Sequence, residues 1–197
     1  MFGGVALAPA SFAQEGYPSK PVRFIAPYPP GGSSDVLARV LAQKLTDALG
    51  RQVIVENRPG AAGNIGHEIV AKSPADGYTL LLTTKSQLVN NQYLYKRLPF
   101  DPLADFSLVT MIAYAGHVLV VHPAVPARNV KELISLARAQ PGKLSYGSAG
   151  IGSTVGIVAE VFKSIARVDI VHVPYKGAVL AVADVVGGQI EMMFADM

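Results

Sequence analysis

The sequence predicts an α/β protein in which two lobes, each built on a parallel sheet, enclose a cleft. Short apolar strands alternate with amphipathic helices along most of the chain, an order that favours parallel strands. Two glycine- and serine-rich loops, at 29–34 and 147–154, each follow a strand and lead into a helix. Between them, the apolar run from Leu108 to Val121 breaks the alternation, so we expect it to pass from one lobe to the other.

The first strand and helix can be derived residue by residue. An apolar, β-branched and aromatic strand over 22–26 is followed by three prolines, which cannot donate to a sheet ladder. Two glycines then free the backbone, and Ser33 or Ser34 is expected to cap the helix. Asp35 lies in the first turn, where negative charge suits the helix dipole, and Gly50 follows the last apolar position.

The remaining elements repeat this alternation. Asn129 is a suitable N-cap, and a glycine pair at 187–188 is expected to end the last helix. Further strands are expected at 53–55, 78–82, 144–146, 171–174 and 189–195, and further helices at 64–72, 86–95, after Asn129, along the apolar stripe 155–165, and at 178–186.

We place the boundary between the lobes near residue 116, with a first lobe over 17–115 and a second over 116–197. The last expected strand stops two residues before the end of the chain. Because domains seldom end beside a buried strand, we expect a fragment in which the second lobe is truncated and the first lacks a C-terminal return.

Composition excludes several classes of protein. With 50% hydrophobic and 16% charged residues, the chain is not disordered, and it has no apolar run of the roughly 18 residues that a membrane helix needs. A net charge of +3 and scattered basic residues argue against nucleic-acid binding. The absence of cysteine removes disulfides, thiolate metal sites and cysteine nucleophiles.

The N-terminus indicates export. Residues 1–10 are uncharged and largely apolar, and Ser11-Phe12-Ala13 has small residues at the two positions that a signal peptidase inspects. We interpret residues 1–13 as the remainder of a secretory signal peptide that lacks its basic start. A packed or disordered extension is the alternative.

Both glycine loops are suited to an anion. The start of a helix carries unpaired N–H donors and partial positive charge, and glycine lets a carboxylate or phosphate approach them. In open α/β sheets, ligands bind at the carboxyl ends of the strands, so two such loops predict one anion held from two sides.

A nucleotide- or anion-binding α/β enzyme that uses the same loops is the alternative function. The spacing of Gly150, Gly152 and Gly156 is close to a dinucleotide fingerprint. The acid expected at the end of the next strand is missing, however, because Asp169 stands at that strand's beginning. No Gly-Lys-Ser/Thr motif follows either loop, which argues against a P-loop.

The sequence indicates no catalytic residue, metal site or cofactor. No two of the four histidines have i, i+4 spacing, and we expect each to be packed or at the surface. No Gly-x-Ser-x-Gly elbow is present, so the loop serines are expected to cap helices. Arg23 and Arg58 are interpreted as structural hydrogen-bond donors in preference to partners of a ligand.

Several long motifs resemble one family. Pro-Pro-Gly-Gly-Ser-Ser-Asp, Glu-Asn-Arg-Pro-Gly-Ala-Ala-Gly-Asn, Ala-Asp-Gly-Tyr and Val-Pro-Tyr-Lys-Gly occur in this order. They resemble the solute-binding proteins of tripartite tricarboxylate transporters, the Bug or TctC family, over nearly all of the chain from Tyr17. The resemblance implies a periplasmic-binding-protein type II-like fold. It also implies a non-enzymatic periplasmic receptor that closes on a small carboxylate, such as a di- or tricarboxylate, an amino acid or an aromatic acid, and delivers it to a membrane permease.

The resemblance also implies a ligand site. Two glycine loops would hold the carboxylate through backbone N–H groups, and residues after the third and last strands would complete the wall. This set comprises Tyr28, Pro30, Gly31, Gly32, Ser33, Ser34, Thr83, Thr84, Ser86, Ser148, Ala149, Gly150, Gly152, Ser153, Thr154 and Asp196. Many relatives carry a histidine after the second loop, where this chain has Val155-Gly156-Ile157, so a contact in the distal pocket is expected to differ.

Overall fold

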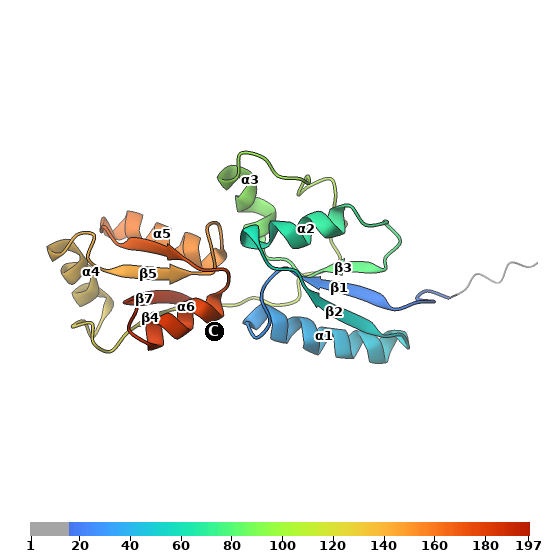
Figure 1. Cartoon of the computed structure of the whole chain (residues 1–197), viewed down its shortest axis with the longest axis horizontal. Coiled ribbons are helices and arrows are strands. Elements are labelled where there is room, and N and C mark those ends of the chain that lie inside the picture. The colour runs from blue at the N-terminus through green and yellow to red at the C-terminus, as the bar shows by residue number, and fades with distance from the viewer. Residues whose placement is uncertain (1–15) are drawn as a thin grey trace, which may run out of the picture.

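The computed structural model describes residues 16–197, and Figure 1 shows that they form two α/β units side by side. The N-terminal lobe contains β1 to α3, and the C-terminal lobe contains β4 to β7. The signal peptide that the sequence predicts over 1–13 lies outside the described residues. In the described part of the chain, none of the helices is both long and apolar enough to cross a membrane.

The N-terminal lobe has a parallel sheet with strand order β2-β1-β3, as the alternating pattern predicts. Phe24 at the centre of β1 pairs with Val55 of β2 and Leu80 of β3. Figure 1 shows α1 and α2 on opposite faces of this sheet. The elements are β1 (Val22–Ala26), α1 (Ser33–Leu49), β2 (Val53–Asn57), η1 (Ala61–Gly63), α2 (Asn64–Ala71), β3 (Thr79–Leu81), the π-helical turn η2 (Ser86–Asn90) and α3 (Asn91–Leu94).

The ends of α1 agree only in part with the sequence prediction. Gly50 adopts the left-handed conformation, with φ 65°, and its N–H donates to the Thr46 carbonyl, so the predicted C-terminal cap is confirmed. The predicted cap by Ser33 or Ser34 is wrong, because Gly32 occupies the N-cap position and no side chain caps the helix. The Ser33 hydroxyl instead donates to Asp196 of the other lobe, at 3.0 Å.

The C-terminal lobe has a mixed sheet with strand order β4-β7-β5-β6. β5 runs parallel to β6 and β7, but β4 runs antiparallel to β7, which corrects the expectation of a parallel sheet. β4 begins at His117, opposite Asp196 at the end of β7, and therefore runs away from the point where β7 ends. The elements are β4 (His117–Val121), α4 (Val130–Ala139), β5 (Ser145–Ser148), α5 (Thr154–Ala166), β6 (Val171–Pro174), α6 (Ala178–Val186) and β7 (Met192–Asp196).

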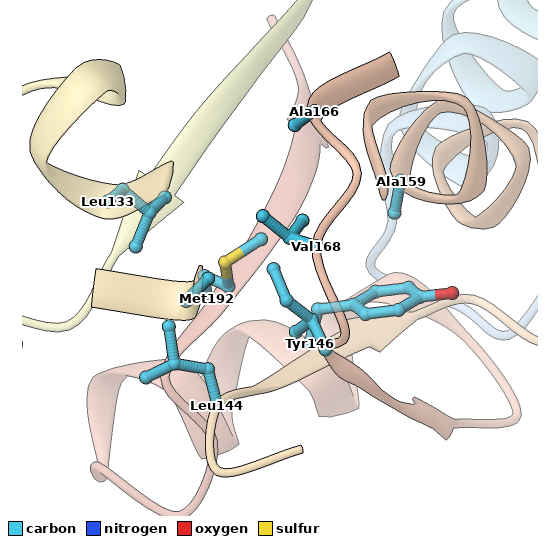
Figure 2. Packing of buried hydrophobic residues seen from close by; sticks show 9 residues of the cluster. Leu133, Leu144, Tyr146, Ala159, Ala166, Val168 and Met192 are labelled. Carbon is cyan, nitrogen blue, oxygen red and sulfur yellow. The ribbon is translucent and has the colours of Figure 1, made fainter. Parts of the chain in front are cut away.

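The core of this lobe joins two helices to the sheet. Figure 2 shows Leu133 of α4 and Ala159 of α5 around Tyr146 of β5 and Met192 of β7, and all four are at most 2% exposed. Both helices begin at the predicted caps, because Asn129 and Ser153 each accept a hydrogen bond from a backbone N–H three residues later. Burial of these apolar side chains is the main stabilising contribution to the lobe.

The apolar run between the lobes forms a strand only in its last part. Residues 107–116 have no regular structure, and β4 begins at His117. Leu108, Val109, Met111 and Tyr114 are all more than 80% exposed. The apolar run that starts at Leu108 therefore has no strand partners among the described residues before position 117.

Replacing Leu133 by alanine is expected to lower the free energy of unfolding by about 3 kcal/mol, because the change opens a cavity in a closely packed core. Urea denaturation would measure the loss. The matched control is Val130→Ala in the same helix, where the side chain is half exposed and the expected change is within about 0.5 kcal/mol. Equal losses in both variants would contradict this account of the core.

Candidate functional site

A cavity of about 110 Å³ lies between the two lobes. Its walls come from the segments that follow β1, β2, β5 and β6, and these strands are parallel within each lobe. Ligands bind to open α/β sheets at this carboxyl edge. The lining residues are Pro27, Tyr28, Gly60, Ala61, Ala62, Gly63, Ala149, Gly150, Tyr175 and Lys176.

A left-handed turn at residues 60–63 forms one wall of the cavity. All four residues have positive φ angles, including the two alanines, at 47° and 51°. Such a conformation is costly for alanine and is retained where the surroundings impose it, often at functional sites. Gly63 has no room for a side chain, since a Cβ atom would lie 1.7 Å from Nε2 of Gln87. Sequence reasoning missed this turn, although the motif Pro-Gly-Ala-Ala-Gly was the available signal.

His67 supports this turn from behind. Its ring is fully buried, with Nδ1 2.9 Å from the Gly63 carbonyl oxygen and Nε2 2.6 Å from the Thr83 hydroxyl. The carbonyl can only accept, so Nδ1 carries the hydrogen and Nε2 accepts from Thr83. Burial lowers the pKa of His67, which keeps the ring neutral. The prediction of a packed histidine is confirmed here, and Thr83 is engaged by it.

The first glycine loop already holds a carboxylate of the chain itself. Asp35, which is 4% exposed, accepts a hydrogen bond from the Gly31 N–H at 3.0 Å, and it also pairs with Arg39 and Asn57. The Arg39 hydrogen bond is the main reason that the pKa of Asp35 is lowered to about 2, and the Gly31 N–H and Asn57 act in the same direction. The predicted acid at the start of α1 is confirmed, but it occupies part of the place that we had assigned to a ligand.

Hydrogen bonds with Ser148 and Ser153 hold the second glycine loop in place. Gly150 and Gly152 have φ angles of 119° and 83°, and a Cβ atom on Gly150 would lie 3.2 Å from the Tyr175 carbonyl oxygen. Ser153 caps α5 and donates through its hydroxyl to the Gly150 carbonyl at 2.7 Å. Ser148 is fully buried, with Oγ 2.7 Å from Nε2 of His172. The hydroxyl of Ser148 therefore lies beneath the loop.

Several of the predicted site residues contact one another across the cleft. The Ser86 hydroxyl donates to the Gly152 carbonyl at 2.6 Å, and the Ser33 hydroxyl donates to Asp196 at 3.0 Å.

Burial raises the pKa of Tyr28 to about 12, so its phenol remains a neutral hydrogen-bond donor. The Thr84 hydroxyl oxygen is buried and has no hydrogen-bond partner within the described residues.

The structure thus divides the predicted site. Tyr28, Ala149 and Gly150 line the cavity, together with residues 60–63, Tyr175 and Lys176, which were not predicted for it. The predicted residues outside the cavity lining are Pro30, Gly31, Gly32, Ser33, Ser34, Thr83, Thr84, Ser86, Ser148, Gly152, Ser153, Thr154 and Asp196. The residues after β3, Asp196 at the end of β7 and the residues of the two glycine loops still lie at the carboxyl ends of their strands.

Lys176 is the charged residue in the cavity lining. Lys176 is exposed and, among residues 16–197, it forms no ion pair. Arg23 and Arg58 both bond to Glu56, which agrees with their predicted structural role. Within the same range, no cluster of histidine and acidic residues could hold a metal ion. Lys176 is therefore the cation that the cavity offers to an anionic ligand.

The comparisons with known proteins identify the class of this protein. A family model described as the tripartite tricarboxylate transporter family receptor, TctC, matches residues 37–197. Because this match covers most of the chain, the chain belongs to that receptor family. The family is one of solute-binding receptors, as the resemblance in the sequence implied.

Particular relatives agree with this assignment. The chain is 40% identical to Protein BugT from Bordetella pertussis over 190 residues, which are 94% of this chain and 58% of BugT. A solved structure titled "Structure of a periplasmic transporter" is 45% identical, with a TM-score of 0.87. "R. palustris Rpa4515 with adipate" is 36% identical, with a TM-score of 0.89. Each structural match covers 91% of this chain and 60% of the other, and together they confirm the predicted α/β fold class.

Replacing Asp35 by asparagine is expected to lower the free energy of unfolding at neutral pH by about 1–2 kcal/mol. The folded state lowers the pKa of Asp35, so its stabilisation is present above about pH 4 and is lost as the pH falls towards about 2. Urea denaturation at several pH values should therefore show the two proteins converging in acid. Asp47→Asn, at an exposed position of the same helix, is the control, and a gap for Asp35→Asn that persists at pH 2 would refute the assignment.

Proposed function

We propose that this protein is a periplasmic receptor that captures a small carboxylate, of which a dicarboxylate is the first candidate, between its two lobes. We further propose that it delivers this ligand to the membrane permease of a tripartite tricarboxylate transporter. The observation that carries the proposal is the position of Lys176 and Gly150 in the wall of one cavity between the lobes. Membership of the receptor family and the adipate bound to a similar protein support it.

The cavity offers three kinds of contact to a carboxylate. Lys176 supplies a positive charge, Tyr28 supplies a neutral phenol, and the backbone at 60–63 and 149–150 can approach a ligand closely. Hydrogen bonds that involve a charged group are among the strongest in proteins. A carboxylate would thus replace water at Lys176, while its remaining atoms would contact the apolar surfaces of Pro27, Ala61 and Ala149.

The other predicted residues have a second role in this proposal. The N–H groups of Gly32, Ser33 and Ser34 form no hydrogen bond within the described residues, and they lie near α6 and Asp196 of the C-terminal lobe. With Thr84, Ser86 and Gly152, they would close the cleft around the ligand and contact it directly or through water. We keep the boundary between the lobes near residue 116, where the chain enters β4.

Reversible closure would link binding to delivery. The contacts recorded between the lobes include single hydrogen bonds such as Ser86–Gly152 and Ser33–Asp196, each of which contributes only about 1 kcal/mol. A ligand that contacts both lobes can therefore shift the balance between open and closed forms. The permease would then distinguish the occupied receptor by its closed shape.

Replacing Lys176 by glutamine is expected to weaken the binding of a dicarboxylate about tenfold, because a charged hydrogen bond to the ligand is lost. Calorimetric titration of adipate, followed by a panel of other small carboxylates, would measure the change. Lys131→Gln removes the same charge from an exposed position on α4 and should leave affinity unchanged. If none of the carboxylates binds the wild-type protein, the proposed function is wrong.

Replacing Gly150 by valine is expected to abolish measurable binding, because its φ of 119° strains a side chain that would also approach the Tyr175 carbonyl. Gly32→Ala is the matched control from the first loop. Its φ of −84° suits alanine, and the nearest atom to a Cβ there is 3.8 Å away, so we expect binding to persist. Thermal shift with adipate separates the two, provided circular dichroism shows that both variants fold.

A further inference from the structure

The buried Ser148 hydroxyl connects the cavity wall to His172, a half-buried residue that lies outside the cavity lining. Ser148 ends β5, and His172 lies on the neighbouring strand β6. The Ser148 oxygen Oγ lies 2.7 Å from Nε2 of His172, and it is also 3.2 Å from both the nitrogen and the carbonyl oxygen of Gly150. One hydroxyl therefore joins the imidazole to the backbone of a residue that lines the cavity.

The hydroxyl has a single hydrogen, so the protonation state of His172 decides where that hydrogen points. In the neutral tautomer that carries its hydrogen on Nδ1, Nε2 accepts the hydrogen from Ser148, while Oγ accepts from the Gly150 N–H. A protonated imidazole donates from Nε2 to Oγ instead, and the serine hydrogen then turns to the Gly150 carbonyl. That carbonyl already accepts the hydroxyl of Ser153, so the environment of Gly150 changes with the charge of His172.

The surroundings of His172 move its titration below the range that is usual for histidine. Its ring stacks on Tyr146 with centroids 4.6 Å apart, and the Tyr146 hydroxyl bonds to Glu160 of α5, which also pairs with Lys163. Burial lowers the pKa of His172; the charge of Glu160 opposes this effect, and that of Lys163 adds to it. The ring is therefore neutral at pH 7. It takes up a proton from solvent only when the pH falls below the usual pKa of histidine.

We propose that His172 is a positioning residue for the cavity, which orients Gly150 through the Ser148 hydroxyl and couples ligand affinity to pH. The part that concerns affinity rests on the proposed carboxylate-binding function. An anion in the cavity and an imidazolium beneath the same loop stabilise each other, and linkage requires the effect to be reciprocal. Affinity for a dianion should then increase as His172 becomes protonated.

The first test needs no ligand. In the ¹⁵N-labelled protein, the backbone amide signal of Gly150 should move with pH, with a midpoint below about 6.5. His172→Gln and Ser148→Ala should each abolish this movement, whereas His122→Gln, directly after β4, should leave it unchanged. A Gly150 signal that does not titrate in the wild-type protein, or that still titrates as in the wild type in a folded test variant, overturns the proposal. Since either variant interrupts the same chain of hydrogen bonds, the result stands even if only one of them folds.

The second test measures affinity for adipate at about pH 7.5 and about pH 5.5. The wild-type protein should bind about fivefold more tightly at the lower pH, at the small end of measured coupling between sites. His172→Gln should lack this gain and show only the contribution of the ligand's own titration, which the comparison of the two proteins removes. Equal pH dependence in both proteins overturns the coupling to affinity. Failure of adipate to bind at either pH counts against the proposed function with this ligand, while the amide titration still decides the role of His172.

Discussion

The direction of the parallel strands is the constraint on which the candidate site depends. In both lobes the strands β1, β2, β5 and β6 end at the cleft, so the loops that follow them supply the walls of a single cavity. At each of these ends the chain must reverse within a few residues. Residues 60–63 and the glycines at 150 and 152 do so with positive φ angles, in turns whose backbone polar groups are not paired by regular structure. The same constraint makes the cleft a natural place for an anion.

The chain itself satisfies many of these backbone groups. Asp35 accepts a hydrogen bond from the Gly31 N–H, and His67 donates one to the Gly63 carbonyl. Ser148 and Ser153 form hydrogen bonds with the backbone of Gly150. Each of these side chains is buried, so the loops are held in one conformation before any ligand arrives. Preorganisation of this kind reduces the entropy lost on binding. The groups left for a ligand are few, and Lys176 is the charged one among them.

The contacts between the lobes are of a different kind from those within them. Each lobe is stabilised by its own apolar cluster, around Phe24 in one and Tyr146 and Met192 in the other. The hydrogen bonds recorded across the cleft, by contrast, are polar and separate, as between Ser86 and Gly152. Strong cores with weak polar contacts between them suit the reversible closure that we propose.

What the sequence determined by itself was local. The order of elements, the Gly50, Asn129 and Ser153 caps, and the glycine loops were all predictable because they depend on neighbouring residues. The π-helical turn at 86–90 and the late start of β4 were not, since sheet pairing and packing decide them.

Only the tertiary structure decided which residues line the cavity and which support it. The sequence pattern placed the anion at the start of α1, yet Asp35 folds back to that position, and residues 60–63 and Lys176 enter the cavity wall from distant segments. The physical reason is that a helix cap or a turn is determined within a few residues, whereas a binding surface depends on side chains far apart in the chain that packing brings together.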